Sequence, residues 1–385
     1  MDEEAYVLLL SKSKINLERR YILKSSKKIV ICVLLILISI ISLILINKNT
    51  NKTFKYKGST IALTVDGNSA TSFPASGKYN VTVNCNNAKG RWNPKTWKLE
   101  ITKITGTVTC DVSFNSNVSN LTTVVNNKAT RNENGKRYQG KNPDNYIWFN
   151  DGLWRIIGNI PVCLTSGCST TESRVKIIRN DSIGAIAFNQ TEYSASSPLT
   201  WIGSNIQNLL NTCYLGKTSS CDSYCYSYST SVKGTCDYSS DGIDTSDYYG
   251  KMVEDVYFNV GAGDETYKTA ANYYIQEIAT HASSTSKIGL MYASDWGYAI
   301  EGVDEVLSSE SPQNSSDKNW LFSNGKEWTM SPYSSSWSLY ASQTGRLSRS
   351  PILIGYSIRP VLYLKSNVYV VSGTGTKVDP YRIGM

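Results

Sequence analysis

The sequence predicts an α+β distal domain, preceded by a small all-β domain and one N-terminal transmembrane helix. Three observations support this prediction. Residues 29–46 contain no charge, proline or glycine. Residues 58–116 alternate apolar and polar side chains with the period of two that strands have. Residues 138–385 combine helical patterns in the middle with strand patterns at both ends, which favours the α+β class.

The apolar stretch IVICVLLILISIISLILI covers residues 29–46. A helix of this length rises by roughly 27 Å at about 1.5 Å per residue, close to the hydrocarbon thickness of a bilayer. A cleaved signal peptide would have a shorter apolar region that ends at small residues, and the segment NKNTNKTFKYK that follows offers no such site. We therefore expect an uncleaved signal anchor that spans the membrane.

Charges and cysteines indicate the orientation of this anchor. Basic residues flank both ends, with a slight excess on the N-terminal side, which favours a cytoplasmic N-terminus. The flanking residues are Arg19, Arg20, Lys24, Lys27 and Lys28 before the span, and Lys48, Lys52, Lys55 and Lys57 after it. We expect residues 1–28 to be a cytoplasmic tail, residues 47–57 a basic spacer, and the rest extracellular. The protein would then be a single-pass protein of the cell membrane.

The cysteine pattern predicts disulfides. Besides Cys32 in the span, the chain has an even number of cysteines, all of them C-terminal to the span: Cys85, Cys110, Cys163, Cys168, Cys213, Cys221, Cys225 and Cys236. Clustered cysteines pair in an oxidising compartment. The four in residues 213–236 have no C-x-x-C spacing and no neighbouring histidine, so zinc is the weaker interpretation. Three pairings of these four stay open.

Residues 58–116 are predicted to form the small β-domain. KYNVTVNC, TWKLEITKI and GTVTCDVSF alternate as strands do. Cys85 and Cys110 fall in two of these strands and would staple the sheet, which a domain of this size needs because it buries little surface. Trp92 and Trp97 are expected in its core. An immunoglobulin-like sandwich that acts as a stalk fits, and so does another small β-sandwich.

The net charge of the exported part is divided between two regions. Residues 47–137 contain 14 Lys and Arg against 4 Asp and Glu, whereas residues 138–385 contain 18 against 23. The basic character thus belongs to the membrane-proximal part, and it does not indicate a nucleic-acid partner. Anionic lipid head groups or wall polymers would be its neighbours; a solvated lysine-rich surface is the alternative.

Residues 117–137 are polar and rich in asparagine, which favours a linker. In the distal domain, strands are expected at YIWF, LWRIIGNI, RVKIIR, KIGLMY, NWLF, EWTMS, WSLYA, IRPVLYL and VYVVS, and a turn closed by Cys163 and Cys168. Residues 200–212 and 269–282 are expected to be helices. Thr200 is the N-cap candidate of the first, with Ile202 and Ile206 on its apolar face.

The order of these segments resembles a family of uncharacterised bacterial surface-protein domains. The segments are YIWFNDGLWRIIG, RVKIIRNDSIG, the helix Trp201–Asn211, KIGLMYASDWGYA, WTMSP and GYSIRPVLYLKS with its GTGTKVDPY tail. This resemblance covers about residues 138–385 and implies the C-type-lectin-like fold, which formylglycine-generating enzymes share. The calcium-binding signatures of lectins and the late cysteine pair of the oxidases are not carried over, because no residues match them at the expected positions.

No motif in the sequence marks an active site. There is neither a P-loop nor a G-x-S-x-G elbow. His281 is the only histidine and falls at the expected end of a helix, where its charge would suit the helix dipole. The acidic segment at residues 237–247 lacks the alternating oxygens and final glutamate of a calcium loop. We therefore expect no catalytic residue, no metal and no cofactor, and lean towards a protein that is not an enzyme.

Aromatic residues point instead to binding. The distal domain holds 22 of the 26 tyrosines and seven of the nine tryptophans, interleaved with serine, glycine and asparagine as in many binding surfaces. Residues 328–350 concentrate this pattern. Trp328 and Met330 are expected in the core. The candidate ligand-binding residues are Tyr333, Trp337, Tyr340, Arg346 and Arg349. The alternative is that Trp337 and Tyr340 only mark the inner face of a strand.

The first hypothesis is a membrane-anchored, extracellular binding or adhesion protein whose lectin-like domain presents an aromatic, disulfide-braced face to a glycan or a surface protein. The second is an extracellular or wall-associated enzyme that acts on polysaccharide, for which a cleft with two carboxylates about 5–10 Å apart would be expected. A purely structural role in the envelope is the third.

Overall fold

The structure is a computed structural model of the chain, and it describes residues 59–191, 201–226, 236–259, 269–279, 283–302 and 317–385. The predicted tail, membrane span and spacer lie outside the described residues, as do Thr200 and His281. Within the described ranges, no helix is long and apolar enough to cross a membrane.

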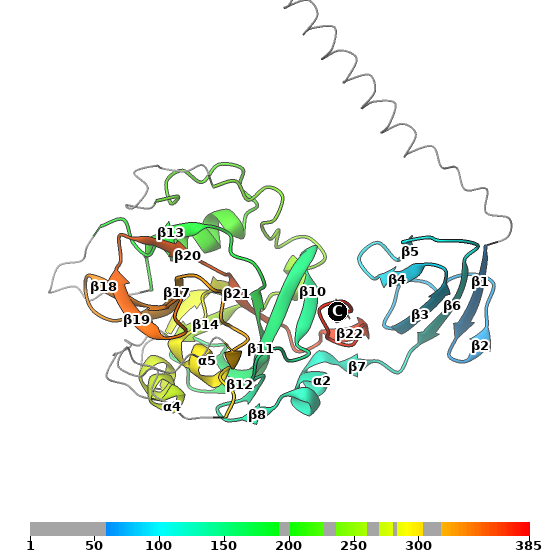
Figure 1. The fold of residues 1–385 in the computed structure, drawn as a ribbon, viewed down its shortest axis with the longest axis horizontal. Coiled ribbons are helices and arrows are strands. Elements are labelled where there is room, and N and C mark those ends of the chain that lie inside the picture. Colours follow the sequence, from blue (N-terminus) through cyan, green and yellow to red (C-terminus); the bar gives the residue numbers. More distant parts are fainter. Residues whose placement is uncertain (1–58, 192–200, 227–235, 260–268, 280–282, 303–316) are drawn as a thin grey trace, which may run out of the picture. The chain divides into compact units, whose positions relative to one another are not determined.

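The small β-domain contains a four-stranded sheet in the order β2-β1-β6-β3 and a separate β4–β5 hairpin (Figure 1). Its strands are β1 (Thr60–Val65), β2 (Asn68–Ser69), β3 (Asn80–Asn86), β4 (Lys89–Asn93), β5 (Lys98–Thr102) and β6 (Thr109–Asn115). β6 runs antiparallel to β3 and parallel to β1. Asp66 and Gly67 have φ values of 48° and 82°, the conformation that a tight turn between β1 and β2 requires.

Trp92 is the centre of the small-domain core. It is 1% exposed, and its ring meets those of Phe114 and Trp97 edge to face at centroid distances of 4.8 and 5.2 Å. Cys85 faces Cys110 directly in the β3–β6 register, and the two form a disulfide. The predicted disulfide is therefore confirmed, and it joins neighbouring strands of one sheet.

The main sheet of the distal domain has nine strands, with the order β15-β14-β11-β12-β21-β16, β10 and β9 on β11, and β8 on β9. They are β8 (Arg131–Asn132), β9 (Lys136–Arg137), β10 (Tyr146–Phe149), β11 (Gly152–Cys163), β12 (Thr171–Arg179), β14 (Val256–Asn259), β15 (Ser283–Ser286), β16 (Ile288–Gly289) and β21 (Val361–Leu364). The 12-residue β11 contacts four of these strands, so it organises the sheet.

A second sheet of five strands has the order β13-β20-β17-β18-β19. These strands are β13 (Ala185–Ala187), β17 (Glu327–Pro332), β18 (Trp337–Ala341), β19 (Leu347–Pro351) and β20 (Gly355–Ser357). Figure 1 shows β17, β18 and β19 grouped beside β13 and β20. A third sheet joins β7 (Ser119–Asn120), β22 (Tyr369–Ser372) and β23 (Arg382–Gly384). Trp328 and Met330 of β17 are fully buried.

The described part is mostly β with few helices, so the α+β prediction overestimates the helical share. The helices are α2 (Leu121–Lys128), α3 (Asn205–Asn208), α4 (Ala270–Tyr274) and α5 (Ala293–Tyr298), with the π-helical segments η1 (Leu209–Tyr214) and η4 (Ile275–Ala279) and the 3₁₀ turn η3 (Gly250–Met252). The side chain of Ser204 caps α3 by accepting from the backbone N–H of Gln207 at 3.2 Å. The helix therefore begins later than predicted, which leaves Ile202 51% exposed while Ile206 is buried.

The prediction of a linker at residues 117–137 is wrong. This stretch contains β7, α2, β8 and β9, and β9 pairs with β11 of the main sheet. Asn120 caps α2, and Leu121 and Val125 lie in the core of the distal domain. Two apolar residues four positions apart lie on the same side of a helix, and here they pack that side of α2 against the core although the surrounding residues are polar.

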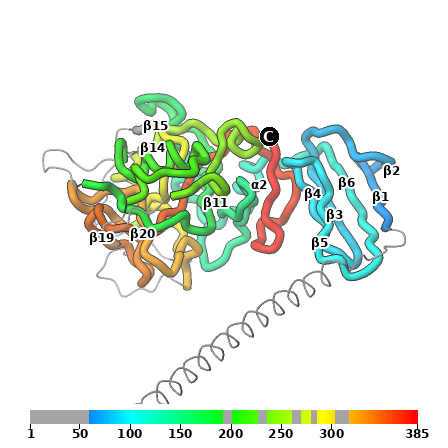
Figure 2. Tube along the Cα trace, turned by 90° about the horizontal axis from the view of Figure 1, so that it is seen from above, coloured from blue at the N-terminus to red at the C-terminus, as the bar shows by residue number. Residues whose placement is uncertain are grey.

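The small domain and the distal domain share an apolar contact. Tyr369 and Val371 of β22 belong to the same buried cluster as Trp92. The Tyr369 hydroxyl also donates to the backbone carbonyl of Gly77 at 3.1 Å. In Figure 2 the C-terminal segment lies between α2 and β4. Residues 60–385 accordingly form one compact unit.

Disulfides close the loops of the distal domain. Cys163 pairs with Cys168 in the turn between β11 and β12, as predicted. The pairing that the sequence left open is Cys213 with Cys221 and Cys225 with Cys236. All eight predicted disulfide cysteines are therefore paired in sequence order.

Candidate functional site

Three of the five predicted ligand-binding residues meet at one end of the five-stranded sheet. Tyr333 follows β17, Trp337 begins β18 and Arg349 lies in β19. The Arg349 guanidinium lies 4.7 Å from the centroid of the Tyr333 ring and 5.7 Å from that of Trp337, and it donates a hydrogen bond to the Tyr333 hydroxyl. Trp337 is 39% exposed and Arg349 is exposed. We call these three residues the aromatic cluster.

The other two predicted residues have different surroundings. The half-buried Tyr340 stacks on Tyr356 at a centroid distance of 4.7 Å and contacts the core residue Trp328 at 6.3 Å. Arg346 lies half-buried in the turn before β19. Their surroundings fit packing of the sheet better than presentation to a ligand.

A pocket of about 380 Å³ lies near the start of β17, at the other end of the same strand. Six of its lining residues bear on what it can bind: Arg155, Asp181, Trp320, Phe322, Glu327 and Arg359. We call it the Arg155 pocket. Its position follows from local pairing, because Arg155 on β11 faces Tyr146 on β10, and Glu327 on β17 faces Ser357 on β20.

The two arginines of this pocket are held in different ways. The Arg359 Nε–H donates to the Oε1 atom of Glu327 at 2.8 Å, and this ion pair is buried. Arg155 is sandwiched between the rings of Tyr146 and Trp320, at centroid distances of 4.1 and 4.6 Å. Burial lowers the pKa of Arg155 to about 10, and the positive charge of Arg359 acts in the same direction. Arg155 therefore remains a cation at neutral pH.

A second set of charges is fully buried behind helix α5. Asp295 accepts from the guanidinium of Arg137 at 2.8 Å and from the ammonium of Lys176. Burial opposes the charge of Asp295, but Lys176 and Arg137 outweigh it and lower its pKa. This buried ion network links β9, β12 and α5.

Glu277 belongs to the same buried region. Its carboxylate accepts from the backbone N–H groups of Ala293 and Ser294, both at 3.0 Å, and from the hydroxyl of Ser331. Burial raises the pKa of Glu277 to about 7, although these hydrogen bonds act against the shift. The group thus titrates near neutrality while remaining inaccessible, which gives it a role in stability.

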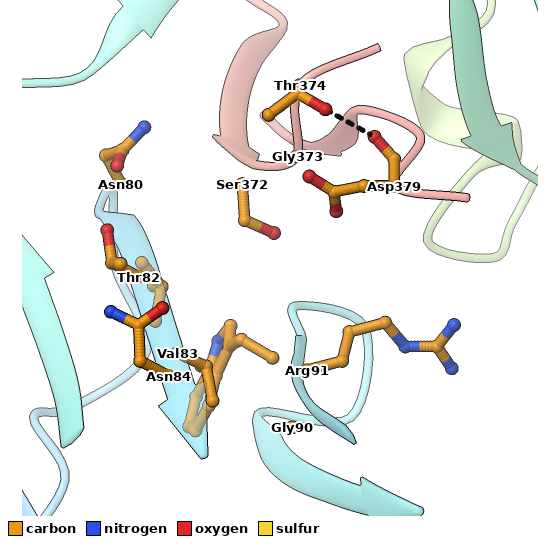
Figure 3. A pocket seen from close by; sticks show the side chains of 12 residues that line it. Asn80, Thr82, Val83, Asn84, Gly90, Arg91, Ser372, Gly373, Thr374 and Asp379 are labelled. Carbon is orange, nitrogen blue, oxygen red and sulfur yellow. Dashed lines mark hydrogen bonds between the residues drawn. The ribbon is translucent and has the colours of Figure 1, made fainter. Parts of the chain in front are cut away.

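A further pocket of about 360 Å³ lies between the small domain and the segment after β22 (Figure 3). Asn80, Thr82 and Arg91 line one side, and Thr374 and Asp379 line the other. The Thr374 hydroxyl donates to the backbone carbonyl of Asp379 at 3.4 Å. Arg91 is already paired with Glu100. The polar walls of this pocket fit a hydrated junction between the two domains.

Sequence reasoning missed the Arg155 pocket because its residues are far apart in the chain. One signal was available: Arg155, Lys176 and Arg359 stand inside or beside strongly apolar strand segments. A charge in a strand that is buried on both faces needs a partner, so these residues predict buried ion pairs or sites. Their partners could not be read from the sequence.

No protein-family model matches the chain, and comparisons with curated proteins and with solved structures give no match either.

Proposed function

We propose that the chain is a membrane-anchored extracellular binding protein, and that its distal, lectin-like domain binds a glycan or a surface protein through the aromatic cluster. One observation carries the proposal. A tryptophan ring that is 39% exposed lies beside an exposed arginine, and that arginine also covers a tyrosine ring. Because this arrangement leaves part of the Trp337 ring in water, its burial under a ligand would be favourable.

The chemistry of the cluster favours a glycan over a protein. Flat aromatic faces suit the apolar faces of sugar rings, and the tyrosine hydroxyl and the guanidinium supply hydrogen bonds at the edges. Contact between Arg349 and both rings also restricts the side chains before binding, which lowers the ordering cost of association.

The proposed location has separate support. The sequence of residues 29–46 fits a membrane span, and the eight cysteines after it pair in four disulfides, as expected of an oxidising compartment. The resemblance of residues 138–385 to bacterial surface-protein domains agrees with this location, and we propose that the basic residues 47–137 contact anionic lipid or wall polymers there.

The full chain in detergent tests the proposal by binding to three carbohydrates: insoluble peptidoglycan, hyaluronate and dextran. We expect Trp337→Ala to weaken binding to the preferred polymer by about tenfold or more, since hot-spot aromatic residues cost 2 kcal/mol or more when truncated. Phe73→Ala is the matched control, because Phe73 is 38% exposed but belongs to the small domain. Equal binding by both variants and the unaltered protein would contradict a role for the aromatic cluster.

The enzyme hypothesis keeps one supporting observation. Asp181 and Glu327 line the same pocket, and glycoside hydrolysis uses a pair of carboxylates. Release of reducing ends from peptidoglycan or hyaluronate, lost in Glu327→Gln, would establish this activity. Undiminished release by Glu327→Gln would exclude Glu327 from it.

A further inference from the structure

The Arg155 pocket contains a buried cation for which the described residues supply no anionic partner. Arg155 is 6% exposed, and its guanidinium donates to the side-chain oxygen of Asn145 at 2.8 Å and to the backbone carbonyl of Pro143 at 3.3 Å. Both acceptors are neutral. Among the residues that the structure describes, none places a carboxylate within ion-pair distance of Arg155. The two flanking rings support the cation, but a buried guanidinium is ordinarily paired with an anion.

The same pocket contains an acceptor to which no described residue donates. Glu327 is 1% exposed, and its Oε1 atom accepts from Arg359. Its Oε2 atom has no hydrogen-bond partner within the described ranges. A buried carboxylate oxygen left without a donor is destabilising, and a ligand hydroxyl that points at it would remove this cost.

From these two groups we propose that the Arg155 pocket binds one residue of an acidic sugar, whose carboxylate pairs with Arg155 and whose hydroxyl donates to Glu327. The Nε and Nη2 atoms of Arg155 already donate to Asn145 and Pro143, and the remaining N–H groups of the guanidinium would donate to the carboxylate. The half-buried Phe322 provides an apolar wall for the sugar ring. The volume of about 380 Å³ falls within the range of roughly 300–1,000 Å³ that small-molecule pockets have.

The charges around the pocket favour a ligand with a single negative charge. Arg155 and Arg359 are opposed by Glu327 and by Asp181, which lies exposed at the rim. Two carboxylates near the anion disfavour a doubly charged phosphate monoester, whereas a sugar acid offers one charge and several hydroxyl donors. The pocket therefore selects for the combination of carboxylate and hydroxyl groups.

This site is separate from the aromatic cluster. Opposite Glu327 and Tyr333 on β18, Ala341 pairs with Glu327 and the Trp337 carbonyl accepts from the Tyr333 N–H, and these two positions are four residues apart, which corresponds to roughly 13 Å at about 3.3 Å per residue. The inference therefore does not depend on binding at the cluster, and the two sites can be tested independently.

The test is calorimetric titration of the full chain in detergent with methyl β-glucuronide and with methyl β-glucoside, which differ only at the carboxylate. We expect the glucuronide to bind at least tenfold more tightly, and Arg155→Gln to remove this preference, since a charge-assisted hydrogen bond changes affinity by about tenfold or more. Equal affinity for both sugars, or no binding of either, would overturn the proposal.

Two further variants keep the test decisive if Arg155→Gln does not fold. Asp181→Asn removes an exposed negative charge from the rim, so it should strengthen glucuronide binding by about two- to fivefold. Phe322→Ala should weaken both sugars by about fivefold through loss of the wall. Unchanged glucuronide affinity in both variants would place the sugar elsewhere.

Two controls test the chemistry and the location of the site. Glycerol phosphate that binds as tightly as the glucuronide would overturn the assignment to a sugar acid. The variant Trp337→Ala should leave the affinity for the glucuronide unchanged.

Discussion

Two arginines of the distal domain each contact one tyrosine ring and one tryptophan ring, but one is exposed and the other is buried. Arg349 contacts the rings of Tyr333 and Trp337 at 4.7 and 5.7 Å and is exposed. Arg155 contacts two rings at 4.1 and 4.6 Å and is 6% exposed. The first keeps its hydration and can exchange it for a ligand, while the second has already lost most of its hydration to the fold.

The aromatic cluster and the Arg155 pocket also differ in how far their residues lie apart in the sequence. The aromatic cluster comes from 17 consecutive residues, 333–349, on neighbouring strands, so its composition is visible in the sequence. The Arg155 pocket needs segments near residues 155, 181, 320 and 359. An exposed site that is built from consecutive residues can be recognised from the composition of the sequence. A buried charged site that is built from distant segments can be recognised only once the fold is known.

The largest expected effect concerns the buried ion pair of the Arg155 pocket. Glu327→Ala should lower the free energy of unfolding by about 3–5 kcal/mol, because it leaves the buried Arg359 without its partner. Asp181→Asn, on the exposed rim of the same pocket, should change it by less than about 0.5 kcal/mol. Urea denaturation of both variants measures this. Similar, small effects of the two substitutions would show that the pocket is open to water. The Arg155 pocket would then not differ from the aromatic cluster in its exposure to solvent.

The next effect is the pH dependence that Glu277 imparts. Its pKa is raised from 4.5 in the unfolded chain to about 7 in the folded protein, because it is buried. The folded state then binds more protons between these two values, so stability is complete below pH 4.5 and is lost as the pH rises through 7. The predicted loss is roughly 3 kcal/mol.

Thermal melting of the unaltered protein and of Glu277→Gln across pH 5 to 8 measures this dependence. The variant, which cannot ionise, should show a flatter profile in this range. A variant whose melting temperature falls with pH as steeply as that of the unaltered protein would assign the dependence to other groups.

A smaller effect separates the two arginines directly. Arg155→Gln should lower the free energy of unfolding by about 2 kcal/mol, because Asn145 and Pro143 lose a charged donor and two rings lose a stacked cation. Arg349→Gln should cost less than about 1 kcal/mol, since its contacts are exposed. Equal costs in urea denaturation would contradict the assignment of different roles to the two side chains.

Sequence patterns predicted many of the described strands, but the predicted strand NWLF forms turns with isolated bridges at Asn319, and the patterns failed where distant segments decide the structure. YIWF and WSLYA match β10 and β18, and all eight cysteines pair. The asparagine-rich stretch at residues 117–137 resembled a linker because its pairing partners, β11 and β22, follow later in the chain.

The helices illustrate the same limit. The patterns at residues 200–212 and 269–282 are helical in period, but the observed elements are short and pass into π-helical turns. In the candidate site, the sequence placed Tyr333, Trp337 and Arg349 in or near loops, whereas Trp337 begins β18 and Arg349 lies in β19. It could not indicate that Tyr340 stacks on Tyr356, because that contact depends on the pairing of β17 with β18 and β20.

Binding at the two sites is tested most directly by NMR of the full chain labelled with ¹⁵N-tryptophan, in which the indole signal of each tryptophan is followed during titration with a sugar. Trp337→Phe and Trp320→Phe identify the two relevant signals. On titration with a neutral dextran oligosaccharide, we predict that the Trp337 signal shifts while the signal of Trp328, which is fully buried, does not. On titration with methyl β-glucuronide, the Trp320 signal should shift instead. Sugars that leave both the Trp337 and the Trp320 signals in place would contradict a binding function for this face of the protein.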